Sequence, residues 1–265
     1  MTKFAKTKQT FMTEIKGKWA LVTGASRGIG ALAAKFLAER GCNVVLQSRK
    51  KSHLDAVLAE VKNMGVEAYS VECQLEDDKD VKRMLKEIDD NGTNIEIVLN
   101  NAGIQVTYRA YPEYYNTPAE DFVESLKVNT IAPMLICYHY LPRMIKAGFG
   151  RIVNTTSGIR LEPEQAAYSA SKAGLDKITM DLASKIDGTD VVLNLTDPGW
   201  CRTDLGGPNA PNAPESALPG VVLGVFADDR KSGQSLKTPT RPPGTTYSVV
   251  PDSMTELDVA PSSVV

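Results

Sequence analysis

The chain has 265 residues, of which 42% are hydrophobic and 23% charged, and this balance is typical of one large globular domain with its own core. The formal net charge of −2 gives no indication of a nucleic-acid partner or of an anionic membrane surface as partner. Four widely separated cysteines with no Cys-x-x-Cys pair, and only two histidines, argue against a disulfide framework, a zinc site or a histidine-based metal centre.

Short apolar runs alternate with longer amphipathic stretches over the first two hundred residues. In chain order, strands are expected at 19–24, 43–48, 67–73, 95–103, 150–157 and 190–196, and helices at 30–40, 51–65, 78–92, 119–148 and 165–186. Ser52 is expected to cap the second helix and Gly65 to end it. The alternation predicts an α/β fold, a single Rossmann-like doubly wound domain with a mainly parallel sheet of about seven strands.

The texture of the sequence changes after Leu205, because nine of the fifteen prolines lie in the last sixty residues. We expect a flexible loop at 206–214, one short helix within 215–229 and a last strand at 232–236.

The folded domain is expected to span residues 17–237, between a loose arm at 1–16 and a poorly ordered tail at 238–265. The basic N-terminus lacks the apolar core of a signal peptide, and the sequence has no run of 18 apolar residues. We therefore expect a cytoplasmic protein without a membrane span.

A glycine-rich turn, "TGASRGIG" (23–30), follows the first strand and opens the first helix. Glycines at 24, 28 and 30 permit a tight turn and close approach of the backbone to a ligand, and the N–H groups of the helix N-terminus would face a pyrophosphate. The turn predicts a dinucleotide site. The alternative is a glycine-rich turn required only for packing.

The second strand ends in "LQSRK", and no acidic residue follows it until Asp55. A site for NAD would place a carboxylate here for the ribose 2′-OH. Instead Ser48 and Arg49 stand at this end, and Arg27 lies in the glycine-rich turn. Two guanidinium groups suit a 2′-phosphate, which predicts NADP(H) as cofactor, unless both arginines are ordinary surface charges.

Six motifs in one order resemble the short-chain dehydrogenase/reductase family over residues 17–205. They are "TGASRGIG" (23–30), "NNAG" (100–103), "KVNT" (127–130), "GRIVNTTS" (150–157), "YSASK" (168–172) and "DPGWCRT" (197–203). The resemblance implies a nicotinamide-dependent oxidoreductase whose single domain, 17–237, binds both cofactor and substrate.

The resemblance assigns catalysis to Asn129, Ser157, Tyr168 and Lys172. Tyr168 and Lys172 are four positions apart and share a helix face. A free tyrosine has a pKa of about 10, and a nearby ammonium together with an oxidised nicotinamide would lower it. Tyr168 is expected to be the acid/base, Lys172 to hold the nicotinamide ribose, Ser157 to bind the substrate oxygen and Asn129 to hold a relay water.

The cofactor contacts that the resemblance and the turn predict cover the phosphates, the adenosine and the nicotinamide end. They are Gly24, Ser26, Arg27, Ile29, Gly30, Ser48, Arg49, Gln74, Leu75, Asn101, Ala102, Gly103, Tyr168, Lys172, Pro198, Gly199 and Thr203. For Asn101 a role in tying strands together is an equal alternative, and Pro198-Gly199 has the alternative of simply turning the chain.

The sequence departs from the family pattern in three places. Ser157 precedes Tyr168 by eleven positions instead of twelve or thirteen, and Thr155 stands at thirteen; the strand text favours Ser157 with a short deletion after it. Gln74 stands where an aspartate is usual beside the adenine. The segment after Thr203 is short, as in carbonyl reductases, which leaves the site open to bulky substrates.

The substrate is expected to meet the loop "YRAYPEYY" (108–115), because ligands bind beyond the carboxyl ends of parallel strands. Tyr108, Leu161 and Trp200 are the predicted pocket residues, since their side chains suit a flat or hydrophobic molecule. The alternative is that these tyrosines pack against the neighbouring helix or a second subunit.

The leading hypothesis is an NADPH-dependent reductase of a ketone or aldehyde, reversible as an alcohol dehydrogenase, with a steroid or other bulky carbonyl as substrate. A 3-oxoacyl thioester reductase and a non-catalytic NADP(H) sensor are the alternatives. An insertion before the tyrosine that keeps some relatives monomeric is absent, so a homodimer or homotetramer is expected.

Overall fold

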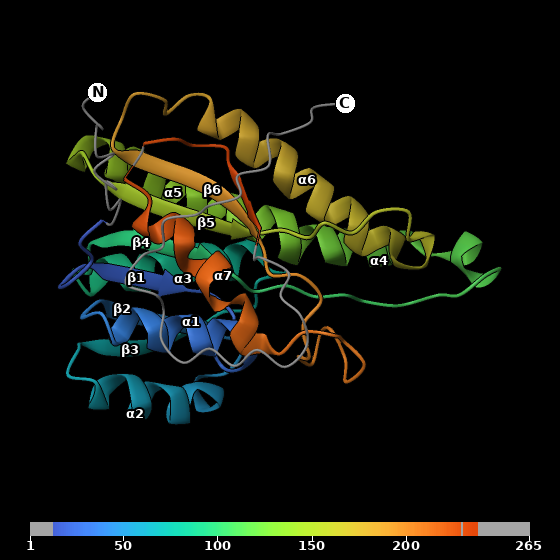
Figure 1. The fold of residues 1–265 in the computed structure, drawn as a ribbon, viewed down its shortest axis with the longest axis horizontal. Coiled ribbons are helices and arrows are strands. Elements are labelled where there is room, and N and C mark those ends of the chain that lie inside the picture. Colours follow the sequence, from blue (N-terminus) through green and yellow to red (C-terminus); the bar gives the residue numbers. More distant parts are fainter. Residues whose placement is uncertain (1–12, 229, 238–265) are drawn as a thin grey trace, which may run out of the picture.

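The computed structural model describes residues 13–228 and 230–237, and within them the chain forms one parallel sheet with helices on both faces. The strand order is β3-β2-β1-β4-β5-β6-β7, and every pair of neighbours is parallel. The strands are β1 (Trp19–Val22), β2 (Asn43–Ser48), β3 (Ala68–Glu72), β4 (Ile95–Asn100), β5 (Gly150–Thr155), β6 (Val191–Asp197) and β7 (Ser235–Lys237). The predicted doubly wound architecture is confirmed (Figure 1).

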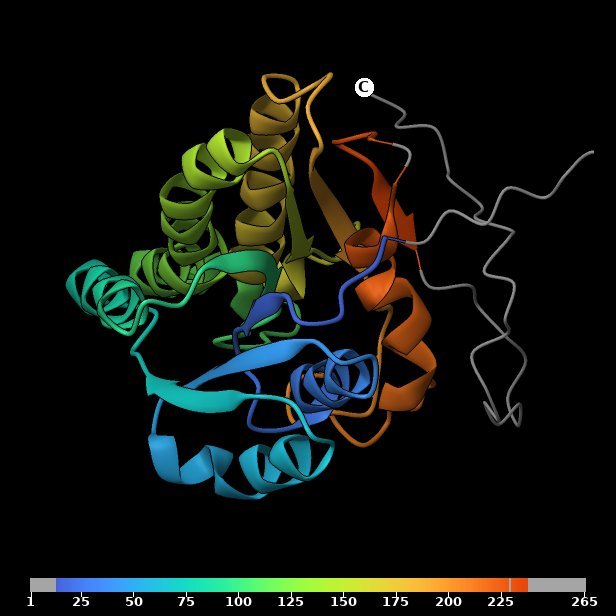
Figure 2. The ribbon, with the colours of Figure 1, turned by 90° about the vertical axis from the view of Figure 1, so that its left-hand side faces the viewer.

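The sheet divides the hydrophobic core into two layers, and helices cover each layer from outside (Figure 2). Helices α1 (Gly28–Ala38), α2 (Asp55–Asn63) and α7 (Leu218–Phe226) cover one face, and α3 (Asp78–Asp90), α5 (Ala132–Ala147) and α6 (Ala166–Ala183) cover the other. Along β1, Ala20 and Val22 enter the first layer while Leu21 enters the second. This alternation, with both sets buried, is the reason for the uninterrupted apolar runs in the sequence.

The long helix predicted at 119–148 is in fact broken into three parts. They are α4 (Ala119–Leu126), a π-helical turn (Lys127–Ile131) and α5. The turn contains Asn129, whose buried side chain bonds to the backbone of a neighbouring loop. A π-helical turn inserts one extra residue into a helix and commonly occurs at functional sites. The apolar periodicity continues through the turn, so it gave no sign of the break.

The second predicted helix, 51–65, also differs in its first turn. A 3₁₀ turn at Lys51–Leu54 precedes α2, whose N-cap position is Leu54 with no side-chain cap, so the prediction that Ser52 caps the helix is wrong. The predicted end is confirmed, because Gly65 has a φ of +84° just after the helix.

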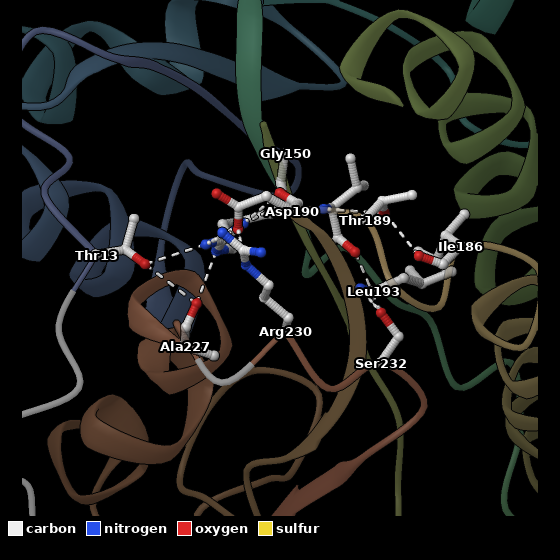
Figure 3. A network of polar contacts seen from close by, with 11 residues as sticks. Thr13, Gly150, Ile186, Thr189, Asp190, Leu193, Ala227, Arg230 and Ser232 are labelled. Atoms are coloured by element: carbon white, nitrogen blue, oxygen red, sulfur yellow. Dashed lines mark hydrogen bonds and ion pairs between the residues drawn. The ribbon is translucent and has the colours of Figure 1, made fainter. Parts of the chain in front are cut away.

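At the amino ends of the strands, the buried side chain of Arg151 contacts Thr13, Gly150, Asp190 and Ala227, and these four partners are labelled in Figure 3. Its Nε donates to the carbonyl of Ala227 at 2.8 Å, and its Nη1 donates to the carbonyls of Gly150 and Asp190 at 2.9 and 2.8 Å. Its Nη2 donates to Thr13 Oγ1 at 3.2 Å and to the Asp190 carboxylate at 2.9 Å. All five guanidinium N–H groups are therefore used.

Residues 13–16 fall within the arm that the sequence predicts, yet they pack onto the domain. Ile15 is buried in the first core layer, and Thr13 N donates to the carbonyl of Phe226 at 3.0 Å. The rest of the predicted arm and the predicted tail at 238–265 lie outside the described residues.

After β6, a 3₁₀ turn (Pro214–Ala217) leads into α7, which is the short helix expected within 215–229. The expected flexible loop at 206–214 is held by hydrogen bonds: Arg202 Nη1 donates to the carbonyls of Ala210 and Pro211, and Trp200 Nε1 donates to Gly206. Among the residues described, no helix has the length and apolar character that crossing a membrane requires.

Candidate active site

The glycine-rich turn lies between β1 and α1, where close packing dictates two of its glycines. A Cβ on Gly24 would lie 2.9 Å from Ala102 Cα, and a Cβ on Gly30 would lie 2.3 Å from the carbonyl oxygen of Gly24. The turn is thus pressed against the "NNAG" segment. The packing role is present whether or not the turn also binds a ligand.

The beginning of α1 fits a phosphate group. Its N-cap residue, Arg27, makes no side-chain capping bond, and the first turn contains no acidic residue. The unpaired N–H groups and the positive end of the helix dipole therefore face outward without a protein carboxylate to satisfy them. Gly28 has a φ of +57° and no side chain to cover this end.

Asn101 ties β1 and β4 together at the same edge. Its Nδ2 donates to the carbonyl of Thr23 at 3.2 Å, and the backbone N–H groups of Asn101 and Ala102 both donate to Thr23 Oγ1 at 3.1 Å. The structural role that the sequence left open for Asn101 is therefore present.

The end of β2 carries the residues predicted to bind the adenosine. Ser48 is buried and donates to the carbonyl of Lys50 at 2.7 Å, while Arg49 is exposed. Gln74 Nε2 donates to the carbonyl of Arg49 at 2.8 Å, so the amide in place of the usual aspartate supports the backbone of Arg49. Leu75 is buried beside it.

Arg27 points toward the loop that follows β6. Its Nε lies 2.6 Å from the Asp204 carboxylate, with both side chains more than half exposed. A Cβ on Gly28 would lie 3.3 Å from Thr203 Cγ2. The loop after β6 therefore contacts the glycine-rich turn, as expected if Thr203 and Gly199 border the same ligand.

Tyr168 and Lys172 lie in the first two turns of α6. Lys172 is buried, its Nζ donates to the carbonyl of Thr155 at 2.7 Å, and it lies 5.8 Å from the centroid of the Tyr168 ring. Burial lowers the pKa of Lys172 to about 8, against the opposing effects of Asp176 and Asp197.

The pKa of Tyr168 in the chain alone is shifted in the direction opposite to the expected one. Burial raises it, a hydrogen bond with Ser157 lowers it, and the charge of Asp197 raises it. The ammonium of Lys172 is directed to Thr155 instead of the phenol. To lower the pKa of Tyr168 below its ordinary value, a further positive charge must come close to the phenol, such as that of an oxidised nicotinamide.

Ser157, rather than Thr155, has its hydroxyl at the tyrosine. Ser157 lies close enough to the phenol to lower the pKa of Tyr168, and its Oγ accepts from the N–H of Ile159 at 3.3 Å. Thr155 contributes its carbonyl to Lys172, and Thr156 donates its hydroxyl to Asp176. The geometry agrees with a short deletion after Ser157.

Asn129 in the π-helical turn is fully enclosed. Its Oδ1 accepts from the N–H of Ile104 at 2.8 Å, and its Nδ2 donates to the carbonyl of Ile104 at 2.8 Å and to Ser171 Oγ at 3.0 Å. Ser171 in turn donates to the carbonyl of Tyr168 at 2.7 Å. Asn129 thus connects the "NNAG" loop to the first turn of α6.

The three predicted pocket residues lie on three successive loops, after β4, β5 and β6. Tyr108 is 63%, Leu161 97% and Trp200 59% exposed. Among the described residues they form no ring pair or hydrogen bond with one another. Tyr111, Tyr114 and Tyr115 instead pack together, with centroids 4.5 to 6.4 Å apart.

Two carboxylates near the site were not found by the sequence analysis. Asp176 stands four positions after Lys172 on α6, a spacing that puts both on one helix face. Asp197 directly precedes Pro198 and accepts from the N–H groups of Gly158 and Gly199. The helical spacing could have identified Asp176, whereas the contacts of Asp197 depend on how two loops meet.

The parallel sheet, the glycine-rich turn at its carboxyl edge and the tyrosine–lysine pair beside it define an oxidoreductase of the dinucleotide-binding Rossmann type. A family model described as short chain dehydrogenase matches residues 18–213. The chain belongs to this family, whose members use a nicotinamide cofactor and act on CH–OH or C=O groups.

Two curated relatives span most of the chain. The 3-oxoacyl-(acyl-carrier-protein) reductase of Aquifex aeolicus is 35% identical over 195 residues, 72% of this chain and 77% of that protein. Carbonyl reductase family member 4 of Danio rerio is 31% identical over 219 residues, 82% of this chain and 88% of that protein.

Two solved structures share the architecture. A metagenomic short-chain oxidoreductase in complex with NADP has a TM-score of 0.71 and 30% identity, covering 86% of this chain and 100% of that chain. A putative gluconate dehydrogenase from Agrobacterium tumefaciens has a TM-score of 0.77 at 24% identity, covering 86% of this chain and 96% of that chain, and shows the same fold.

Proposed function

We propose that the protein is an NADP(H)-dependent reductase that converts a ketone or aldehyde to an alcohol, reversibly. The observation that carries the proposal is that the Ser157 hydroxyl lies close enough to the Tyr168 phenol to lower its pKa, next to a buried Lys172, at the sheet edge that also holds the glycine-rich turn.

The four side chains have distinct roles in this proposal. Ser157 and Tyr168 hold the carbonyl oxygen, and Tyr168 gives it a proton as the carbon is reduced. Lys172, held by the carbonyl of Thr155, positions the nicotinamide ribose. Asn129 supports the backbone of the tyrosine turn through Ser171 and is the proposed holder of a relay water. When bound, the reduced nicotinamide supplies the hydride.

The preference for NADP(H) rests on charge at the end of β2 and in the glycine-rich turn. Arg27 and Arg49 are both exposed at this edge, and the first acid after β2 comes only at Asp55. Guanidinium groups bind phosphate well, and Arg27 would have to leave Asp204 to do so, while the missing carboxylate removes the usual partner of an unphosphorylated ribose. The NADP complex of a relative agrees with this preference but concerns that protein.

A bulky, uncharged carbonyl compound, such as a steroid or another polycyclic ketone, is the proposed substrate class. Tyr108, Leu161 and Trp200 expose apolar surface on the loops that border the site. A 3-oxoacyl thioester is the second candidate, favoured by a curated relative's activity. Thioesters on carrier groups bring phosphate charges, which the exposed Glu113 and Glu162 on these loops would repel and the exposed Arg160 would attract.

A homodimer or homotetramer is the proposed assembly. Four apolar side chains are largely exposed on the outer face of α4, the π-helical turn and α5: Val123, Ile131, Tyr138 and Ile145. Such a face is typical of a surface that another copy covers.

The first test measures the loss of NADPH absorbance against a panel of ketones, aldehydes, steroids and 3-oxoacyl thioesters, with NADH in parallel. Tyr168→Phe removes only the phenol oxygen, so we expect kcat to fall by about 10²–10⁴-fold while NADPH binding, followed by its fluorescence, stays within a few-fold. Tyr138→Phe, an exposed tyrosine on α5, is the matched control and should keep full activity.

Full turnover by Tyr168→Phe would reject the proposed acid/base. NADPH binding without turnover on any panel member would favour the sensor alternative. Equal rates with NADH would reject the assignment of Arg27 and Arg49 to a 2′-phosphate.

A further inference from the structure

Asp197, the last residue of β6, bridges two loops with one carboxylate. Its Oδ1 accepts from the N–H of Gly199 at 2.9 Å, and its Oδ2 accepts from the N–H of Gly158 at 3.0 Å. Strands β5 and β6 are paired up to Thr155 and Thr196, and beyond this point the backbone ladder ends. The side chain of Asp197 thus continues the connection where the backbone no longer provides it.

The two loops joined in this way carry functional groups of the proposed site. Gly158 directly follows Ser157, whose hydroxyl bonds Tyr168. Gly199 follows Pro198 in the segment proposed to border the nicotinamide. The spacing of the two loops therefore sets the position of the serine hydroxyl relative to the nicotinamide side of the site.

The backbone at both glycines fits this bridge. A Cβ at position 158 would lie 2.7 Å from Asp197 Oδ2, so any side chain there would displace the carboxylate. Gly199 has a φ of +70°, a conformation that L side chains rarely adopt. Glycine at both positions is therefore what allows the Asp197 carboxylate to reach both backbone N–H groups.

Asp197 is also close enough to act electrostatically on the same site. Its charge raises the pKa values of Lys172 and Tyr168, together with that of Asp176. The groups that face this region are Ser157 from the loop after β5, Cys201 from the loop after β6, and three residues of α6: Tyr168, Lys172 and Asp176.

We propose that Asp197 is a positioning residue of the reaction, which fixes Ser157 and the Pro198–Gly199 segment at the spacing that carbonyl reduction requires. The proposal rests on the proposed function. It goes beyond it by assigning a fifth side chain whose carboxylate acts through two backbone N–H groups and without touching the substrate.

The decisive variant is Asp197→Asn. An amide has a single acceptor oxygen, and its NH₂ group would face a backbone N–H, so one bridge bond is lost at nearly constant size. Asp176→Asn is the matched control, because it removes a second carboxylate beside Lys172 but leaves both bridge bonds intact. We expect kcat to fall by about 10²-fold in Asp197→Asn and by less than ~10-fold in Asp176→Asn.

A double-mutant cycle with Ser157→Ala shows whether Asp197 acts through the serine. We expect Asp197→Asn to cost at most a few-fold once the hydroxyl is gone, because residues that act through one another are not additive. Two results would overturn the proposal: equal losses in the two aspartate variants, which indicate a charge effect alone, or full additivity with Ser157→Ala.

A readout without turnover separates this proposal from the proposed function. Amide hydrogen exchange should accelerate in Asp197→Asn at the glycine that loses its bond, Gly158 or Gly199, and should stay unchanged at both in Asp176→Asn. Unchanged exchange at both glycines would also overturn the bridge. If exchange responds as expected but no panel carbonyl is reduced by the wild type, the proposed function fails while the bridge stands.

Discussion

At the residue scale, Lys172 shows how burial sets the working range of a charged group. Desolvation lowers its pKa to about 8, whereas Asp176 and Asp197 oppose this shift. Because an unfolded lysine binds its proton up to a higher pH, this group makes the free energy of unfolding rise as the pH increases from about 8 toward the ordinary lysine pKa. Its ammonium form, by contrast, dominates only below about 8.

The pH dependence of the reduction tests this residue. If the ammonium positions the ribose, kcat/KM should fall as the pH rises through about 8, the pKa of Lys172. The fall should follow the titration curve of a single group that loses one proton. Lys172→Arg keeps its charge over the whole range, so its lower rate should lack this alkaline limb. A limb that persists unchanged in Lys172→Arg would assign the titration to another group, such as Tyr168.

At the element scale, the sequence predicts one continuous helix over 119–148, but the π-helical turn at Lys127–Ile131 interrupts it. In the π-helical segment the side chain of Asn129 points inward and forms hydrogen bonds with Ile104 and Ser171. On the outer side, Ile131, Tyr138 and Ile145 are exposed. These three apolar residues recur every seven positions, the spacing of a face that meets another helix. We therefore expect this face to be covered by a second copy of the chain.

The assembly is tested by placing a charge on this face. Tyr138→Glu should lower the molar mass measured by light scattering, because an unpaired carboxylate would be buried between copies. Lys146→Glu, an exposed position on the same helix, should leave the mass unchanged. A wild-type protein that is monomeric at all concentrations, or an unaltered mass in Tyr138→Glu, would contradict the proposed interface.

At the scale of the whole molecule, Arg151 connects Thr13 and Ala227, near the two ends of the described residues, at the amino ends of the strands, opposite the site. Thr13, Asp190 and Ala227 come from distant parts of the sequence, yet each accepts a hydrogen bond from one guanidinium (Figure 3). Its removal would take one donor from each of these acceptors. Ala227 would keep the hydroxyl of Thr13, the Asp190 carbonyl would keep the N–H of Gly150, and the Asp190 carboxylate would keep its ion pair with Arg230.

Arg151→Met should lower the free energy of unfolding by about 1–3 kcal/mol, measured by urea denaturation, because buried acceptors lose hydrogen bonds while Asp190 keeps Arg230. Arg143→Met is the comparison: that arginine also pairs with a carboxylate, Asp89, but is half exposed, and its loss should cost less than about 1 kcal/mol. Similar losses in the two variants would show that the buried network contributes no more than a surface ion pair.

The sequence by itself determined the strands, most of the helices, the parallel sheet and the spacing of Tyr168 and Lys172. These features follow from short apolar runs for the strands and a period of 3.6 residues for the helices, which each segment carries on its own. The cofactor and catalytic roles remain predictions.

The tertiary structure alone decided how distant segments meet. It inserted the π-helical turn at Asn129, left Ser52 without a capping role, and raised the pKa of Tyr168 by burial. It also brought Gly158 to Asp197, 39 positions away, and Thr13 to Arg151, 138 positions away. Such contacts depend on which strands become neighbours and how their loops pack, and no local pattern contains that information.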